Sequence, residues 1–118
     1  MWGNSNAERM SEMALYHFNE EGFDKALGTN SLMMVDFWAT WCGPCQRLGP
    51  VIEQIAEDYE GQNVIIGKVD VDEEPGLAQR FGVMNIPTVV FFKNGQELER
   101  KVGAMPIDEY TQFLDENL

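Results

Sequence analysis

The two cysteines of the chain, Cys42 and Cys45, are separated only by Gly43 and Pro44. Thiols at this spacing can form a reversible disulfide, supply half of a four-ligand metal site, or lie close together by accident. A purely structural bridge explains them poorly, because closing so short a loop contributes only about 2 kcal/mol of stability. Zinc also explains them poorly, because His17 and scattered carboxylates would have to complete the site. The spacing therefore favours redox chemistry and no metal.

The residues around the cysteines predict that the pair lies where a strand is followed by a helix. Residues 32–38 are almost continuously apolar, which is typical of a strand buried on both faces. From Gly43 to Tyr59 apolar residues recur at helical spacing, and Pro44 suits the first turn of a helix. The free N–H groups at that helix start would favour the Cys42 thiolate, the attacking species in disulfide exchange. Cys45, nearly one turn later, would lie close enough to attack the resulting mixed disulfide.

The rest of the chain predicts an α/β fold, a mixed sheet with helices on both faces. Further strands are expected at residues 15–18, 64–71, 88–93 and 97–102, the last two joined by the two-residue turn Asn94-Gly95. Further helices are expected at residues 20–27, 74–81 and 106–114, the first of them capped by Asn19.

Length and charge limit the possible functions. The 118 residues fit one domain, which we expect over residues 11–118. Residues 1–10 are polar and aperiodic, which predicts a flexible N-terminal extension left by cloning or by a misplaced start. No secretory signal and no membrane-spanning run is recognisable, so we expect a cytoplasmic location. The formal net charge of −12 argues against nucleic acids and anionic membranes as partners.

The eleven residues from Val35 to Cys45 carry a family resemblance. This segment looks like the active-site segment of the bacterial members of the thioredoxin family. At suitable spacings it is followed by Pro50, Lys68, Ile86-Pro87-Thr88, residues 92–95 and residues 102–104. The resemblance covers about residues 14–118 and implies the thioredoxin fold, a central mixed five-stranded sheet flanked by four helices.

The resemblance implies a general protein-disulfide reductase that cycles between a dithiol and a disulfide. Cys42 would be the nucleophile, Cys45 the resolving cysteine, and Asp36 the buried proton acceptor of Cys45, with a pKa raised by burial. Lys68 would lie beside Asp36 and moderate its charge. From the residues alone, Asp36 could also face outward at a bulge and Lys68 could be an ordinary surface lysine.

The resemblance also implies how partners are bound. Residues expected to contact substrate are Trp41, Gly43, Pro44, Ile86, Pro87, Gly103 and Ala104. Pro87 would follow a cis peptide bond, and the backbone of Ile86 would pair with an extended substrate segment. No cofactor would be bound. Electrons would come from NADPH through a flavin-containing thioredoxin reductase, and a monomer would pass them to proteins such as peroxiredoxins, methionine sulfoxide reductases and ribonucleotide reductase.

The two residues between the cysteines favour reduction of substrates over oxidation. A histidine there would stabilise the Cys42 thiolate and the reduced form, and Gly43-Pro44 supplies no such charge. Thr40, Gly49 and Asn85 depart from common family residues and leave partner preference open. Two alternatives remain: an exported thioredoxin-like oxidoreductase with a narrow target, and a non-catalytic binding subunit whose folded surface matters more than its thiols.

Overall fold

The structure, a computed structural model, describes residues 14–118. The predicted extension at residues 1–10 and the predicted start of the domain at Ser11 lie outside the described residues. The elements are β1 (Leu15–His17), α2 (Glu20–Leu27), β2 (Leu32–Trp38), α3 (Gly43–Asp58), β3 (Val64–Asp70), α4 (Pro75–Arg80), β4 (Thr88–Lys93), β5 (Gln96–Val102) and α5 (Ile107–Asn117). Among the described helices, none is long and apolar enough to cross a bilayer.

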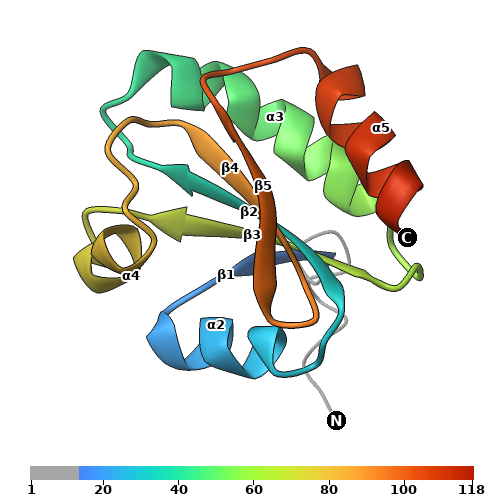
Figure 1. Ribbon diagram of the computed structural model, residues 1–118. Helices are drawn as coiled ribbons and strands as arrows, with labels where there is room; N and C mark the ends of the chain where they lie inside the picture. The colour runs from blue at the N-terminus through green and yellow to red at the C-terminus, as the bar shows by residue number, and fades with distance from the viewer. Residues whose placement is uncertain (1–13) are drawn as a thin grey trace, which may run out of the picture.

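The strands form one mixed sheet in the order β1-β3-β2-β4-β5 (Figure 1). Strand β3 pairs in parallel with β1 and β2, whereas β4 runs antiparallel to β2 and β5. Helices α3 and α5 cover one face of the sheet, and α2 and α4 cover the other. The predicted α/β class is therefore confirmed, and the predicted elements agree with the observed ones to within a few residues at each end.

Strand β2 lies at the centre of the sheet and is buried on both faces, as its apolar run predicts. Side chains alternate along a strand, so Leu32 and Met34 pack under α3 and α5, whereas Met33 and Phe37 pack against the α2 and α4 side. The same alternation turns Asp36 toward the face covered by α3. The strand thus carries a carboxyl group beneath the helix that begins at the cysteine pair.

Local signals explain where several elements start and stop. The Asn19 side chain accepts a hydrogen bond from the Gly22 N–H at 2.8 Å, which confirms the predicted cap of α2. Asn94 and Gly95 have φ angles of 55° and 78°, the left-handed pair that a two-residue hairpin turn requires. The hairpin also contains an irregularity between Phe91 and Phe92 that the sequence did not predict.

The edge strand β1 is fixed to the sheet by an aromatic side chain. Phe18, directly after β1, is buried against Gly67 of β3, and a Cβ atom at position 67 would overlap its ring. Its ring also meets Phe23 of α2 edge-on, with centroids 5.8 Å apart. The missing side chain at Gly67 therefore makes room for the contact that holds β1, β3 and α2 together.

Candidate active site

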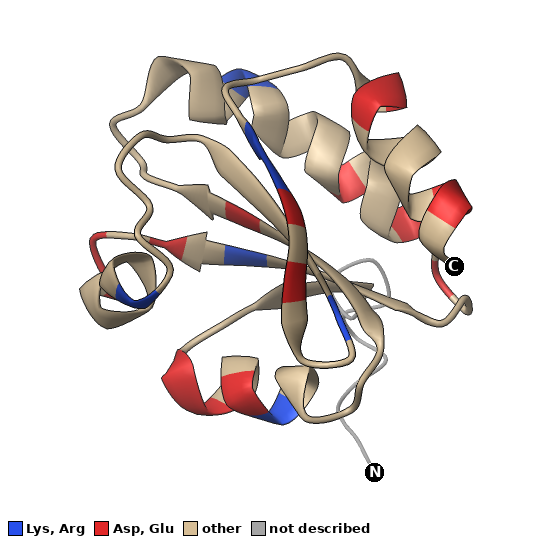
Figure 2. Ribbon diagram, viewed as in Figure 1, with Lys and Arg blue, Asp and Glu red and all other residues tan. Residues whose placement is uncertain are grey.

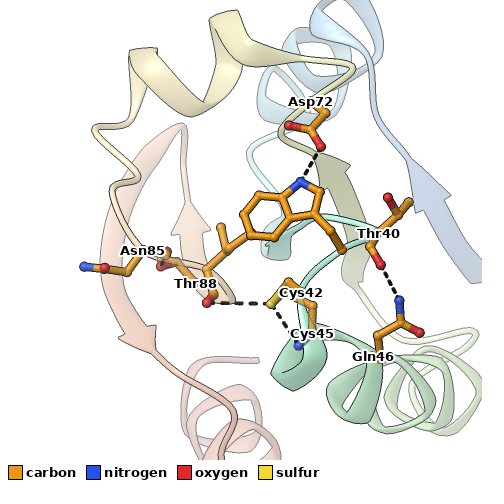
Figure 3. Close-up of a disulfide and its surroundings, with 9 residues drawn as sticks. Thr40, Cys42, Cys45, Gln46, Asp72, Asn85 and Thr88 are labelled. Carbon is orange, nitrogen blue, oxygen red and sulfur yellow. Dashed lines mark hydrogen bonds between the residues drawn. A yellow bond between two sulfur atoms is a disulfide. The ribbon is translucent and has the colours of Figure 1, made fainter.

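Cys42 and Cys45 lie at the N-terminal end of α3, one short loop after β2. They form a disulfide with Cα atoms 5.2 Å apart, within the usual range for such a bond. Cys42 caps the helix, and its Sγ accepts a hydrogen bond from the Cys45 N–H at 3.2 Å (Figure 3). Cys42 is 6% exposed and Cys45 is 2% exposed. The helix start therefore directs an N–H group at the more accessible of the two sulfurs.

The disulfide packs against apolar side chains and against the loop that precedes β4. Ala39, Val71 and Ile86 contact the cysteine pair, and Cys42 Sγ lies 3.9 Å from the Ile86 carbonyl oxygen. The Ile86–Pro87 peptide bond is cis, as the resemblance predicts. Within residues 14–118, no group of three or more His, Cys, Asp or Glu side chains could hold a metal ion.

A second loop, between β5 and α5, is held beside the proline. The Gly103 N–H donates to the Pro87 carbonyl oxygen at 2.8 Å. The buried Tyr110 of α5 fixes the same loop, because its hydroxyl accepts from the Met105 N–H at 3.1 Å and donates to the Gly103 carbonyl at 3.4 Å. The loop between β5 and α5 is thus held against the loop whose Ile86 packs on the cysteine pair.

The residues expected to contact substrate differ widely in exposure. Trp41 is 69% exposed, and Gly43, Pro44 and Ala104 are exposed as well. Ile86 and Gly103 are half-buried, whereas Pro87 is buried. The surface beside the disulfide is therefore dominated by the Trp41 indole.

Asp36 is fully buried, and neither of its carboxylate oxygens has a hydrogen-bond partner. Burial away from water raises the pKa of Asp36 to about 7, and the positive charge of Lys68 opposes this rise. The structure thus places the carboxyl in the interior and not outward at a bulge.

Lys68 lies opposite Asp36 in the parallel pairing of β2 and β3. Its side chain is largely buried, with Nζ 4.2 Å from the centroid of the Trp38 ring. Because the Asp36 oxygens accept no hydrogen bond, Lys68 acts on Asp36 through its electric field and not through a direct bond. Lys68 also lines a small surface cleft with His17 and Asp70. It is therefore not an ordinary surface lysine.

Two further contacts beside the cysteines were missed from the sequence. The Trp41 indole N–H donates to Asp72 Oδ2 at 2.7 Å, and the Gln46 side-chain amide donates to the Thr40 carbonyl (Figure 3). Asp72 stands in an acidic stretch and Gln46 on an exposed helix face, so their residue types suggest only solvation. Only the folded backbone brings each of them to its partner.

Comparison with known proteins agrees with this geometry. The family model named Thioredoxin matches residues 14–116. The chain is 43% identical over 106 residues to the thioredoxins of Staphylococcus aureus strains Mu50 and MW2, which covers 90% of this chain and 100% of theirs. A solved structure, a mutant thioredoxin from Halobacterium salinarum NRC-1, superposes with a TM-score of 0.79. It is 32% identical in sequence, over 97% of this chain and 95% of that chain.

These matches confirm the predicted thioredoxin fold, and the Cys42–Cys45 disulfide stands where a protein of this kind carries its redox-active pair. The chain therefore belongs to the thioredoxin family and is a thiol–disulfide oxidoreductase.

Proposed function

We propose that the protein is a general reductant of protein disulfides in which Cys42 attacks and Cys45 resolves. The observation that carries this assignment is the position of Cys42 Sγ, which accepts the Cys45 N–H at the start of α3. The same N–H and the positive end of the helix dipole stabilise a thiolate at Cys42. Cys45 is less exposed and lies one turn into the helix, which suits an intramolecular second attack.

In the reaction, the Cys42 thiolate attacks one sulfur of a substrate disulfide. The substrate S–S bond breaks, a Cys42–substrate mixed disulfide forms, and the departing substrate thiolate takes a proton from water. Cys45 then loses its proton to the Asp36 carboxylate and attacks Cys42 Sγ. The mixed disulfide breaks, the second substrate thiolate leaves, and two electrons have passed from the protein to the substrate.

Asp36 suits the role of proton acceptor because its pKa of about 7 allows it to gain or lose a proton near neutrality. It faces the helix that carries Cys45 from the strand beneath. We assign Lys68 the role of tuning residue, because its charge lowers the pKa of Asp36 without occupying the carboxylate oxygens.

We assign substrate binding to the surface around the disulfide, formed by Trp41, Gly43, Pro44, Ile86, Pro87, Gly103 and Ala104. Exposure of Trp41 and Ala104 supports an apolar contact with a partner, and the proximity of Ile86 to Cys42 supports backbone pairing with an extended substrate segment. Pro87 contributes by shaping the loop, since its own side chain is buried.

Proteins of the thioredoxin family work with a reductase and with disulfide-containing substrates. For this chain we propose more specifically that a flavin-containing thioredoxin reductase delivers electrons from NADPH. Peroxiredoxins, methionine sulfoxide reductases and ribonucleotide reductase are the substrates we would try first. We further propose that the protein acts in the cytoplasm as a monomer.

Reduction of insulin disulfides with dithiothreitol as electron donor tests this assignment. Cys42→Ser should abolish turnover, because the remaining thiol, Cys45, is only 2% exposed and lacks the N–H contact that stabilises a thiolate at Cys42. Cys45→Ser should instead accumulate a covalent adduct with the substrate on Cys42, detectable by mass spectrometry without reductant. Turnover by Cys42→Ser would refute the nucleophile assignment, and absence of the adduct would refute the resolving role of Cys45.

The same assay separates a general reductant from an oxidoreductase with a narrow target. A narrow-target oxidoreductase would reduce one protein disulfide and leave unrelated ones oxidised, whereas a general reductant should act on insulin and on several unrelated proteins.

A further inference from the structure

Asp72 lies just after β3, beside the active site but outside the set of residues assigned to the reaction. We propose that Asp72 is a positioning residue that holds the Trp41 indole in place as a preformed platform for protein substrates. This inference rests on the proposed function, because it takes docking beside Cys42 as the step that Trp41 serves.

The contact joins an exposed aromatic ring to an exposed carboxylate. The Trp41 indole N–H donates to Asp72 Oδ2 at 2.7 Å, a short distance for an N–H donor and a charged acceptor. The indole is otherwise largely free, with 69% of Trp41 exposed to water. Trp41 directly precedes Cys42, so any change in the orientation of the indole alters the surface next to the attacking sulfur.

Hydrogen bonds hold the backbone of the turn that carries Asp72. The Asp70 side chain accepts from the backbone N–H groups of Asp72 at 2.9 Å and Glu73 at 3.4 Å, and the Glu74 N–H donates to the Asp70 carbonyl at 2.8 Å. The Val71 N–H donates to the Trp38 carbonyl at 2.9 Å, and the Val71 side chain packs against the cysteine pair. The turn after β3 is therefore fixed to the strand that leads into the active-site loop.

A tether of this kind acts on docking more than on chemistry. A free indole would have to be ordered each time a protein substrate binds, and an indole already held by Asp72 avoids that cost. A small disulfide reaches Cys42 without covering the Trp41 ring. Loss of the tether should therefore weaken the reaction with protein disulfides and spare the reaction with small disulfides.

Single-turnover kinetics of the pre-reduced protein test the proposal. Oxidised insulin serves as the protein substrate and bis(2-hydroxyethyl) disulfide as the small one. Acid quenching followed by alkylation counts the thiols that remain on the pre-reduced protein at each time. In Asp72→Ala, the insulin concentration that gives half of the limiting rate should rise about three- to tenfold. The limiting rate and the rate constant with the small disulfide should stay within about twofold of wild type.

Three variants make the result specific. Asp72→Asn keeps an acceptor oxygen for the indole and should remain close to wild type. Glu73→Ala removes an equal charge from the same turn without touching Trp41 and should also remain close to wild type. Trp41→Phe lacks the indole donor, so adding Asp72→Ala to it should cause no further loss. The indole N–H resonance of Trp41 should shift in Asp72→Ala and not in Glu73→Ala.

The outcomes separate this inference from the proposed function. The proposal that Asp72 positions Trp41 would be overturned if Asp72→Ala had the half-saturating insulin concentration of wild type. It would also be overturned if Asp72→Asn raised that concentration as much as Asp72→Ala. An equal fall in the rates with insulin and with the small disulfide would also overturn the proposal, because it would indicate general damage to the site. If instead Cys42→Ser retained turnover in the same experiment, the proposed function would fail whatever the Asp72 variants did.

Discussion

Asp36 is buried without a hydrogen-bond partner for either carboxylate oxygen, and its pKa rises from an ordinary value of 3.8 to about 7. Between these two pH values the folded protein keeps a proton that the unfolded chain has lost. The contribution of Asp36 to the free energy of unfolding is therefore complete below its ordinary pKa and is lost as the pH rises through 7. The proposed proton acceptor therefore reduces stability near neutrality, where it would work.

Replacing Asp36 by Asn should remove this pH dependence. From about pH 4 to about pH 8, wild type should lose about 4 kcal/mol of unfolding free energy relative to Asp36→Asn, since one pKa unit corresponds to about 1.4 kcal/mol. Guanidinium titrations of both oxidised proteins across this range measure the difference. The exposed Glu53→Gln serves as the control and should show no comparable trend. A difference between wild type and Asp36→Asn that stays constant with pH would contradict the argument.

At the residue scale, residue types that are unusual for their setting drew attention to part of the candidate site. Two cysteines at a helix start are such a case, and so is an aspartate inside an apolar strand, although the burial of that aspartate was implied only by the family resemblance. Asp72 could not be found this way, because an aspartate among other acidic residues in a turn looks like ordinary solvation. Its role depends on a hydrogen bond to a side chain 31 positions away, which no local pattern records.

At the scale of elements, β1 depends on the contact between Phe18 and Gly67. Gly67→Ala should lower the unfolding free energy by about 1–3 kcal/mol, because the added methyl group would displace a buried ring. The matched control is Gly49→Ala in α3, where a Cβ atom meets nothing within 4 Å apart from its chain neighbours and the backbone of its own helix. That change should leave stability unchanged or raise it by up to about 1 kcal/mol, because Pro50 restricts the preceding residue and offsets part of the gain in helix propensity.

Urea unfolding of both alanine variants checks this pair of expectations. A stable Gly67→Ala would mean that the ring of Phe18 relaxes freely and that β1 is not fixed by this contact. Loss of stability in both variants would mean that the glycines matter for a reason other than the space beside them.

Element types could be predicted because hydrophobic periodicity and turn residues are local. A few neighbouring residues are enough to predict the continuous apolar run of β2, the helical spacing of α3 and the Asn94-Gly95 turn. The strand order β1-β3-β2-β4-β5 is not local, and it was not predicted, since the family resemblance implied only a central mixed sheet of five strands. The irregularity between Phe91 and Phe92 also escaped prediction, because the residues around it form an ordinary strand pattern.

At the scale of the whole molecule, negative charge dominates. The chain carries 20 acidic and 8 basic residues, and acidic positions occur in both helical layers (Figure 2). Within residues 14–118, ion pairs are limited to exposed or partly exposed contacts such as Arg80–Asp24 and Arg100–Glu97. Such pairs contribute little, so mutual repulsion among the remaining carboxylates opposes the compact state.

Salt should therefore stabilise the protein. Raising NaCl from about 20 mM to about 200 mM at neutral pH shortens the range of charge repulsion and should raise the melting temperature. Differential scanning calorimetry of the oxidised form measures this shift. The shift should shrink near pH 4, where many carboxylates are protonated. A melting temperature that falls with added salt would indicate that attractive pairs outweigh the repulsion.

The pairing of Asp36 with Lys68 across β2 and β3 has a consequence for assembly of the sheet. A slip of one residue between these strands would turn Lys68 to the opposite face and leave the buried carboxyl without its compensating charge. Such a slip should therefore raise the pKa of Asp36 further, because the charge that opposes the effect of burial would be lost. A chain folded in the wrong register would carry intact cysteines and still be recognisable by titration.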